Sequence, residues 1–244
     1  MKRRSSPFRI GTCGFGRTRK DEFSKHLSCV EIQHTFYNPP QVKTLEKWRA
    51  EMPDGFEFTL KAWQMITHDA GTPTYRRLKR EMTDKETVEA GSFRPTETVE
   101  SAWQVTLASA KALNARTILF QCPPKFTQTA ENVRNLRKFF KKIDRGEMIF
   151  AWEPRGTTWD DKTIAKLCGD LDLRHVVDPF KRQTVTPDKI YYRLHGIGGW
   201  RYEYEEGELE ELASMLPRDE TSYVFFNNRV MFDDAVRFTR ILGE

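Results

Sequence analysis

Short runs of strand-forming residues alternate with amphipathic helical runs along the whole sequence, and this alternation limits the fold more than any other feature. The strand candidates begin at Phe8, Cys29, Phe56, Arg116, Met148, Arg174, Lys189 and Ser222. Apolar residues at helical spacing fill segments between them, such as 42–52, 96–113 and 130–143, and Thr96 is the expected N-cap of the second. Such alternation predicts βαβ units and a parallel sheet. Eight units in 244 residues fit a closed (β/α)8 TIM barrel better than an open doubly wound sheet.

The same pattern predicts one domain over residues 1–244, because no shift in composition marks a boundary. The helices after the first and sixth strands are expected to be short or degenerate. An irregular, highly charged insertion from Asp69 to Pro95 follows the third strand. A loop of that length is typical of a lid or a binding element.

Composition restricts the partners and the compartment. The net charge of +5 mildly favours anionic ligands, but the charged residues are interspersed rather than clustered as in a nucleic-acid footprint. No run is apolar enough to span a membrane, and no apolar segment of a signal peptide follows the basic N-terminus. The four cysteines are scattered without a CxxC motif. We therefore expect a cytoplasmic protein without a structural zinc ion.

Polar residues end seven of the eight predicted strands. In a barrel, functional residues lie at the carboxyl ends of the strands. The residues in question are Glu31 and Gln33, Lys61, Gln121, Glu153 and Arg155, Asp178, Arg193 and His195, and Asn227 and Asn228. Residues two apart on a strand share one face. Arg193 and His195 are therefore expected to form one wall of a polar pocket.

Acidic and basic side chains balance among these strand ends, with three carboxylates against Lys61, Arg155 and Arg193. A divalent metal usually needs an excess of carboxylates or several histidines, so we expect neither a permanent metal nor a cofactor. The balance suits a polar substrate with a carboxylate or phosphate group, or a sugar. A purely structural layer of ion pairs is the alternative. Under either interpretation, Glu31 and Glu153 are expected to pair with the neighbouring cations.

The segment "HGIGGW" from His195 to Trp200 follows the seventh strand, where many barrels bind phosphate through backbone amides. Its glycines can equally serve simple turns. Beyond it, Trp200, Tyr202 and Tyr204 can stack on a sugar or base, or can pack internally. Cys13 ends the first strand and is expected to be a small buried filler rather than a nucleophile.

Taken in order, these strand ends resemble the domain of unknown function 72 family, also called YecE-like. The resemblance runs nearly end to end and is carried by "IGTCGF", "VEIQHTFYNPP", "FEFTLKAWQMITH", "LFQCPPKF", "AWEPRGTTW", "VVDPF", "YYRLHG" and "VFFNN". It implies a TIM barrel and these characteristic positions: Glu31, Phe36, Tyr37, Lys61, Gln121, Glu153, Arg155, Trp159, Arg193, His195, Tyr202, Asn227 and Asn228. It implies no reaction, because the family has none established. Cys13, Phe15 and Gln33 depart from the Ser, Trp and Asn that the family usually has.

We therefore expect an enzyme, a hydrolase or an acid–base catalyst, acting on a small polar or anionic ligand. Glu31, Glu153 and His195 are the candidate catalytic residues. The candidate substrate-binding residues are Gln33, Lys61, Gln121, Arg155, Asp178, Arg193, Tyr202, Asn227 and Asn228. A nucleic-acid-binding or nucleic-acid-processing protein is the first alternative and would use Arg76, Arg77, Lys79 and Arg80. A non-catalytic ligand sensor is the second, and the sequence gives no basis for an oligomeric state.

Overall fold

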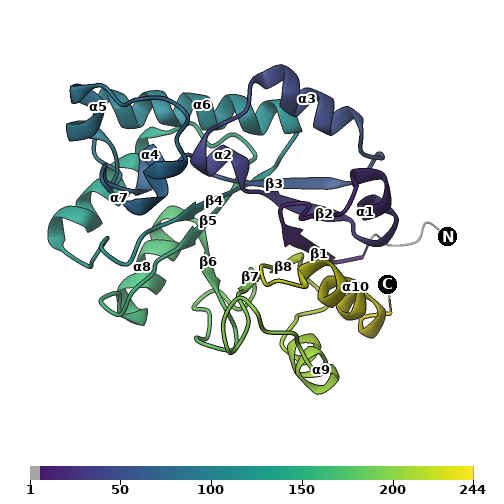
Figure 1. Ribbon diagram of the computed structural model, residues 1–244. Helices are drawn as coiled ribbons and strands as arrows, with labels where there is room; N and C mark the ends of the chain where they lie inside the picture. The colour runs from purple at the N-terminus through teal and green to yellow at the C-terminus, as the bar shows by residue number, and fades with distance from the viewer. Residues whose placement is uncertain (1–5, 244) are drawn as a thin grey trace. The chain divides into compact units, whose positions relative to one another are not determined.

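The chain forms a closed barrel of eight parallel strands that neighbour one another in chain order (Figure 1). The structure is a computed structural model and describes residues 6–243. The strands are β1 (Phe8–Cys13), β2 (Cys29–Ile32), β3 (Glu57–Lys61), β4 (Thr117–Gln121), β5 (Ile149–Glu153), β6 (Leu173–Val177), β7 (Tyr191–Leu194) and β8 (Ser222–Phe226). The TIM barrel expected from the sequence is therefore confirmed.

Helices follow most of the strands. They are α1 (Lys20–His26), α2 (His34–Tyr37), α3 (Val42–Ala50), α4 (Gln64–Thr67), the 3₁₀ helix η1 (Pro73–Arg77), α5 (Asp84–Glu89), α6 (Glu97–Leu113), α7 (Ala130–Lys142), α8 (Asp161–Leu171), α9 (Glu206–Ser214) and α10 (Met231–Ile241). As expected, α1 is short, and the described residues between β6 and β7 contain no helix. The charged insertion is less irregular than expected, because it contains η1 and α5.

Helix ends follow from local sequence. Thr96 caps α6 by accepting a hydrogen bond from Val99, as the sequence predicts, and Thr129 and Asp160 cap α7 and α8 in the same way. Thr83 and Glu86 form a reciprocal capping box at α5. Such side chains satisfy amide groups that have no partner within the helix. Asn114 ends α6 in the left-handed conformation that asparagine tolerates.

The chain divides into two compact units. The first consists of the chain up to Glu31, Glu51–Phe58 and the chain from Arg174 on. In this unit β8 pairs with β1 on one side and with β7 on the other, and α10 packs on β1 and β8 (Figure 1). Aromatic side chains such as Phe23, Phe56 and Phe58 fill its core with edge-to-face contacts.

The second unit consists of Ile32–Ala50 and Thr59–Leu173 and contains the ladder from β3 through β4 to β5. Alternate residues of β4 and β5, among them Phe120 and Phe150, pack against rings of α6 and α7, including Trp103 and Phe140. Because side chains alternate along a strand, the residues between these rings point to the opposite, inner face of the sheet. Lys61, Gln121 and Glu153 end that inner face.

Close strand packing generates a test of the fold in the first unit. A Cβ atom added at Gly11 of β1 would lie 2.2 Å from the carbonyl oxygen of Cys29 on β2. Gly11→Ala should therefore lower the free energy of unfolding by about 1–3 kcal/mol or more, because two backbones must separate. Chemical denaturation measures the effect. Gly169→Ala is the matched control: nothing lies near its added Cβ in α8, so it should raise stability by up to about 1 kcal/mol.

Candidate functional site

Lys61 ends β3 as a buried cation held against aromatic rings. Its side chain is 4% exposed, and its Nζ lies 3.5 Å from the centre of the Phe36 ring and 6.0 Å from that of Tyr37. The carbonyl of Lys61 accepts a hydrogen bond from the Thr35 hydroxyl at 2.7 Å, which fixes the end of the strand to α2. Aromatic faces attract an ammonium group more strongly when water is excluded. Phe36 and Tyr37 therefore hold the charge of Lys61 in place.

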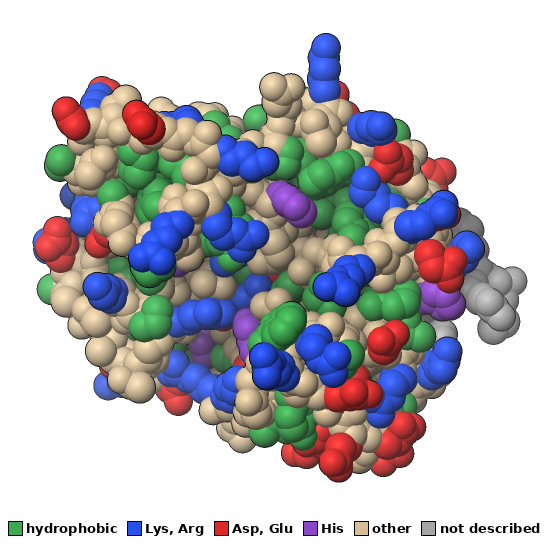
Figure 2. Space-filling model, in the orientation of Figure 1, with side chains coloured by type: hydrophobic (Ala, Val, Ile, Leu, Met, Phe, Trp, Pro, Cys, Tyr) green, Lys and Arg blue, Asp and Glu red, His purple; other side chains and the backbone are tan. Residues whose placement is uncertain are grey.

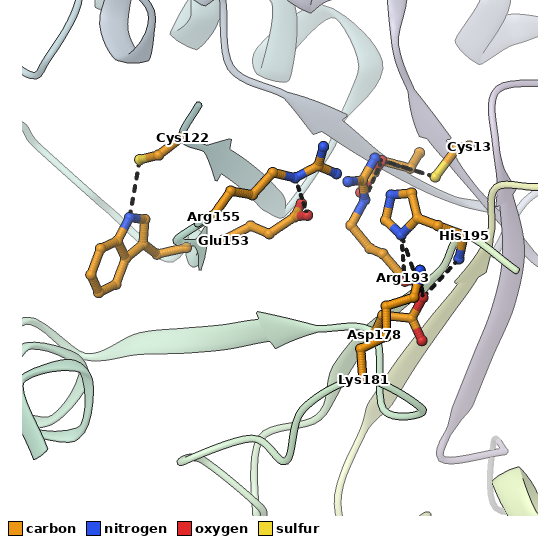
Figure 3. A network of polar contacts seen from close by, with 10 residues as sticks. Cys13, Cys122, Glu153, Arg155, Asp178, Lys181, Arg193 and His195 are labelled. Atoms are coloured by element: carbon orange, nitrogen blue, oxygen red, sulfur yellow. Dashed lines mark hydrogen bonds and ion pairs between the residues drawn. The ribbon is translucent and has the colours of Figure 1, made fainter. Parts of the chain in front are cut away.

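Glu153 ends β5 directly beside Gln121 of β4, its partner in register. Both side chains are buried, so the two strands place a carboxylate and an amide next to each other. Arg155 lies two residues beyond the strand, and its Nε donates to Oε1 of Glu153 at 2.8 Å (Figure 3). The expected pairing of Glu153 with a neighbouring cation is confirmed. Arg155 is partly exposed, whereas Glu153 is not.

The pKa of His68, which directly follows α4, is affected by the charges of Lys61, Arg155 and Glu153. It is buried, and its Nδ1 lies 2.7 Å from the hydroxyl of Thr67. Burial first, and then the positive charges of Lys61 and Arg155, lower its pKa from 6.5 to about 3, while Glu153 opposes them weakly. Around a neutral His68, the second unit thus gathers two cations and one carboxylate.

The first unit has a different polar centre, an ion pair between Glu31 and Arg193. Nε and Nη2 of Arg193 both donate to Oε1 of Glu31, at 3.1 and 2.9 Å. The hydroxyl of Tyr191 donates to Oε2 at 2.6 Å, and the thiol of Cys13 contacts Oε1 at 3.2 Å. Glu31 is 0% exposed and Arg193 is 1% exposed. The expected pairing of Glu31 with a neighbouring cation is therefore confirmed, and that cation is Arg193. Both side chains are as buried as those of a structural ion pair.

Cys13 belongs to this buried centre as a neutral donor. Burial first, and then the charge of Glu31, raise the pKa of its thiol well above the ordinary value. A thiol with a raised pKa is a poor nucleophile. The geometry thus agrees with the expected role of Cys13 as a buried filler.

His195 lies one residue beyond β7, where Asp178 anchors it. Its backbone N–H donates to Oδ2 of Asp178 at 3.1 Å, and its Nδ1 lies 2.9 Å from the carbonyl oxygen of Arg193. A carbonyl only accepts, so Nδ1 carries the proton and Nε2 is the acceptor of the neutral ring. Burial alone would raise the pKa of Asp178, but the His195 hydrogen bonds and the charge of Lys181, 3.5 Å away, lower it (Figure 3).

The remaining predicted residues lie around the ends of β2, β7 and β8. Gln33 follows β2 at the start of α2. The hydroxyl of Tyr202 donates to Glu208, and its carbonyl accepts from Nδ2 of Asn228 at 2.7 Å. Asn228 is buried, and Asn227 is partly exposed. Sequence reasoning missed Tyr191, although its spacing of two from Arg193 puts both on one face of β7.

Basic residues of the insertion are partly neutralised. Arg80 pairs with Glu86, and the guanidinium of Arg77 lies 3.5 Å above the Tyr37 ring. On the face drawn in Figure 2, acidic side chains gather over α9. The expectation that the basic residues of the insertion could bind nucleic acid stays a prediction. Arg76 and Lys79 are exposed on the same insertion.

The described residues offer neither a cluster of metal ligands nor a membrane-spanning helix. Among residues 6–243, no group of three or more His, Cys, Asp or Glu side chains is arranged to hold a metal ion. None of the helices described is long and apolar enough to cross a membrane.

An eight-stranded parallel barrel with polar residues at the carboxyl ends of its strands defines a TIM-barrel protein. The chain belongs to the family described as "Protein of unknown function DUF72", whose model matches residues 16–244. It is 27% identical over 249 residues to the UPF0759 protein YunF of Bacillus subtilis, covering 87% of this chain and 81% of that protein. The resemblance seen in the sequence is thereby confirmed.

Solved structures agree on the fold. A DUF72 family protein from Enterococcus faecalis superposes with a TM-score of 0.76 at 21% identity, covering 97% of this chain and 96% of that one. A D-psicose 3-epimerase, solved in the presence of D-fructose, gives 0.61 at 12% identity and covers 96% of each chain. At such low identity the likeness shows the barrel alone. The expectation that residues of both units share one cavity stays a prediction.

The buried ion pair makes a prediction about stability. Glu31→Gln removes one partner and leaves the guanidinium of Arg193 buried, so it should lower the free energy of unfolding by about 3–5 kcal/mol. Denaturant unfolding monitored by circular dichroism measures the change. The exposed Arg19–Asp21 pair provides the control, since Asp21→Asn should cause a much smaller loss than Glu31→Gln. Similar losses of unfolding free energy in the two variants would contradict the prediction that the buried pair matters more than the exposed one.

His68 makes a prediction about pH. Its pKa in the folded state, about 3, lies below the ordinary 6.5, so the unfolded chain takes up the proton first. The stability from neutral His68 is fully present above about pH 6.5 and is lost toward pH 3, by about 1.4 kcal/mol per pH unit. Unfolding measured between about pH 7 and pH 5 should show a flatter slope for His68→Gln. Above about pH 7 the slopes of the variant and the wild type should coincide, because His68 is then neutral in both the folded and the unfolded chain.

Proposed function

We propose that this protein is an enzyme that acts on a small polar, anionic substrate by acid–base or hydrolytic chemistry, with the end of β3–β5 as its binding and reacting surface. One observation carries the proposal: Glu153, buried at the end of β5, is held at 2.8 Å by the partly exposed Arg155, and Lys61 ends β3 against the rings of Phe36 and Tyr37. Both cations would attract an anionic group of a ligand.

Glu153 is the proposed acid or base of this surface. Arg155 holds Oε1 at 2.8 Å, and Gln121 stands beside it in register, so the carboxylate has a fixed position at the end of a rigid strand. General acid–base groups work when held within hydrogen-bond reach of the proton that they transfer. Lys61, oriented by Phe36, would bind the anionic part of the substrate. In the first unit, His195 is a second candidate for proton transfer, through Nε2, because Nδ1 is turned to the Arg193 carbonyl.

Glu31 has a supporting role in this proposal. Its carboxylate accepts from Arg193, Tyr191 and Cys13, and a general base in that environment would have to leave a buried ion pair. We therefore assign proton transfer to Glu153 rather than to Glu31. Arg193, whose guanidinium is turned to Glu31, is likewise assigned to the architecture of the first unit.

Calorimetry with phosphate, sulfate and glucose 6-phosphate tests the binding part. Lys61→Met should weaken binding about tenfold or more, the effect of losing a hydrogen bond to a charged group. Glu153→Gln should keep or tighten binding, because it removes a negative charge near the anion. Lys162→Met, an exposed lysine of α8, is the matched control and should bind like the wild type. Equal, negligible binding of all three anions by every variant would contradict the proposal.

Turnover is tested with glucose 6-phosphate and fructose 6-phosphate. Release of phosphate reports hydrolysis, and deuterium uptake next to the carbonyl of fructose 6-phosphate, followed by NMR, reports proton abstraction. If either reaction occurs, Glu153→Gln should slow it by about 10²–10⁴. Binding that depends on Lys61 without any reaction would instead favour the non-catalytic sensor.

A further inference from the structure

A second candidate site lies within the first unit, away from the residues assigned above. A groove of about 730 Å³ opens between the loop after β1 and the loop after β8, and the start of α10 closes one side of it. Its volume falls within the range of small-molecule sites, about 300–1,000 Å³. Lys61, Glu153 and Arg155 do not line it. Its ligand therefore has to be inferred from its own lining.

Trp200 supplies an aromatic surface to this groove. Its side chain is 61% exposed, although tryptophan is a costly residue to leave in water. The backbone that carries the indole is held in place, because the carbonyl of Trp200 accepts a hydrogen bond from the backbone N–H of Arg229 at 2.7 Å. An exposed indole on a fixed backbone is suited to stacking on a flat ring.

Arg17 and Arg229 supply positive charge. Both line the groove, both are exposed, and neither has an ion-pair partner among residues 6–243. The N-terminus of α10, whose first turn carries no side-chain cap, adds a partial positive charge, opposed by the carboxylates of Asp233 and Asp234. Guanidinium groups near a helix N-terminus suit a phosphate group.

Asn228 adds an independent sign of a ligand. It is 2% exposed and lines the groove. Its Nδ2 donates to the Tyr202 carbonyl and to Asp234, which fixes the orientation of the amide, and its Oδ1 has no hydrogen-bond partner within the described part of the chain. A buried acceptor without a donor costs about 1–3 kcal/mol. A sugar hydroxyl or a base N–H group would satisfy it.

From these features we propose that the groove binds a nucleotide unit, with the base stacked on Trp200 and the phosphate between Arg17, Arg229 and the start of α10. Asn227, which also lines the groove, offers both an amide donor and an amide acceptor. That pair matches the N6 and N7 edge of adenine. The proposed ligand is therefore an adenine nucleotide, either free or as part of a single-stranded nucleic acid.

Calorimetry with AMP, adenosine, ribose 5-phosphate and inorganic phosphate tests the assignment. AMP should bind most tightly, Trp200→Ala should weaken it about tenfold, and Trp200→Phe should retain most of the affinity. Arg229→Met should weaken AMP but not adenosine. Ile197→Ala, an exposed side chain of the same loop, and Arg218→Met, an exposed arginine outside the groove, are matched controls that should bind like the wild type.

Several results would overturn the proposal: no binding of AMP at millimolar concentration, equal affinity for AMP and ribose 5-phosphate, or AMP affinity unchanged in both Trp200→Ala and Arg229→Met. A short oligodeoxyadenylate distinguishes the two sources of the nucleotide. Tighter binding of the oligomer with a steep salt dependence identifies a single strand, whereas tighter binding of AMP identifies a free nucleotide. Because Lys61 is proposed to bind phosphates as well, all of these titrations are made in the Lys61→Met background, so that failure of the groove and failure of the proposed function give separate results.

Discussion

The buried ion pair between Glu31 and Arg193 is the interaction on which the first unit depends. Neither side chain reaches water, so each needs the other, and Tyr191 and Cys13 complete the shell of the carboxylate. Such a pair is weak evidence for net stability, because desolvation offsets much of the attraction, yet breaking it exposes a strong penalty. The pair joins Glu31 of β2 to Arg193 of β7, and these two residues are 162 positions apart in the chain.

The two units use charge differently, and this difference guides where chemistry is expected. In the first unit, the carboxylate of Glu31 accepts two hydrogen bonds from the guanidinium of Arg193 and is contacted by two neutral donors, Tyr191 and Cys13. In the second, Glu153 is held by the partly exposed Arg155, and Lys61 lies against the rings of Phe36 and Tyr37. A partly exposed ion pair admits a charged ligand more easily than a fully buried one, so we favour the second unit for an anionic substrate.

Much of the fold and many of the residues at the strand ends could be predicted from the sequence, because local patterns determine strands and helix caps. The β-rich runs predicted the eight strands, and Thr96 marked the start of α6. The partner of each charge could not be predicted, because Arg193, Lys61 and Arg155 were all plausible for Glu31 until tertiary structure placed them. His195 and Arg155 lie beyond the ends of their strands, so loop geometry rather than strand period sets the directions of their side chains.

The glycine-rich loop after β7 shows how a phosphate-like motif can serve another purpose. Its amides have partners within the first unit: that of Gly196 donates to the hydroxyl of Tyr204, and that of Gly199 to the carbonyl of Gly196. Gly196 has a positive φ of 81°, and an added Cβ would lie 2.2 Å from the Gly199 carbonyl. The glycines therefore permit a tight turn, and that turn places Trp200 at the groove after β1 and β8. In our proposal the loop thus contributes an aromatic surface to ligand binding, while the arginines and the α10 N-terminus contribute the positive charge.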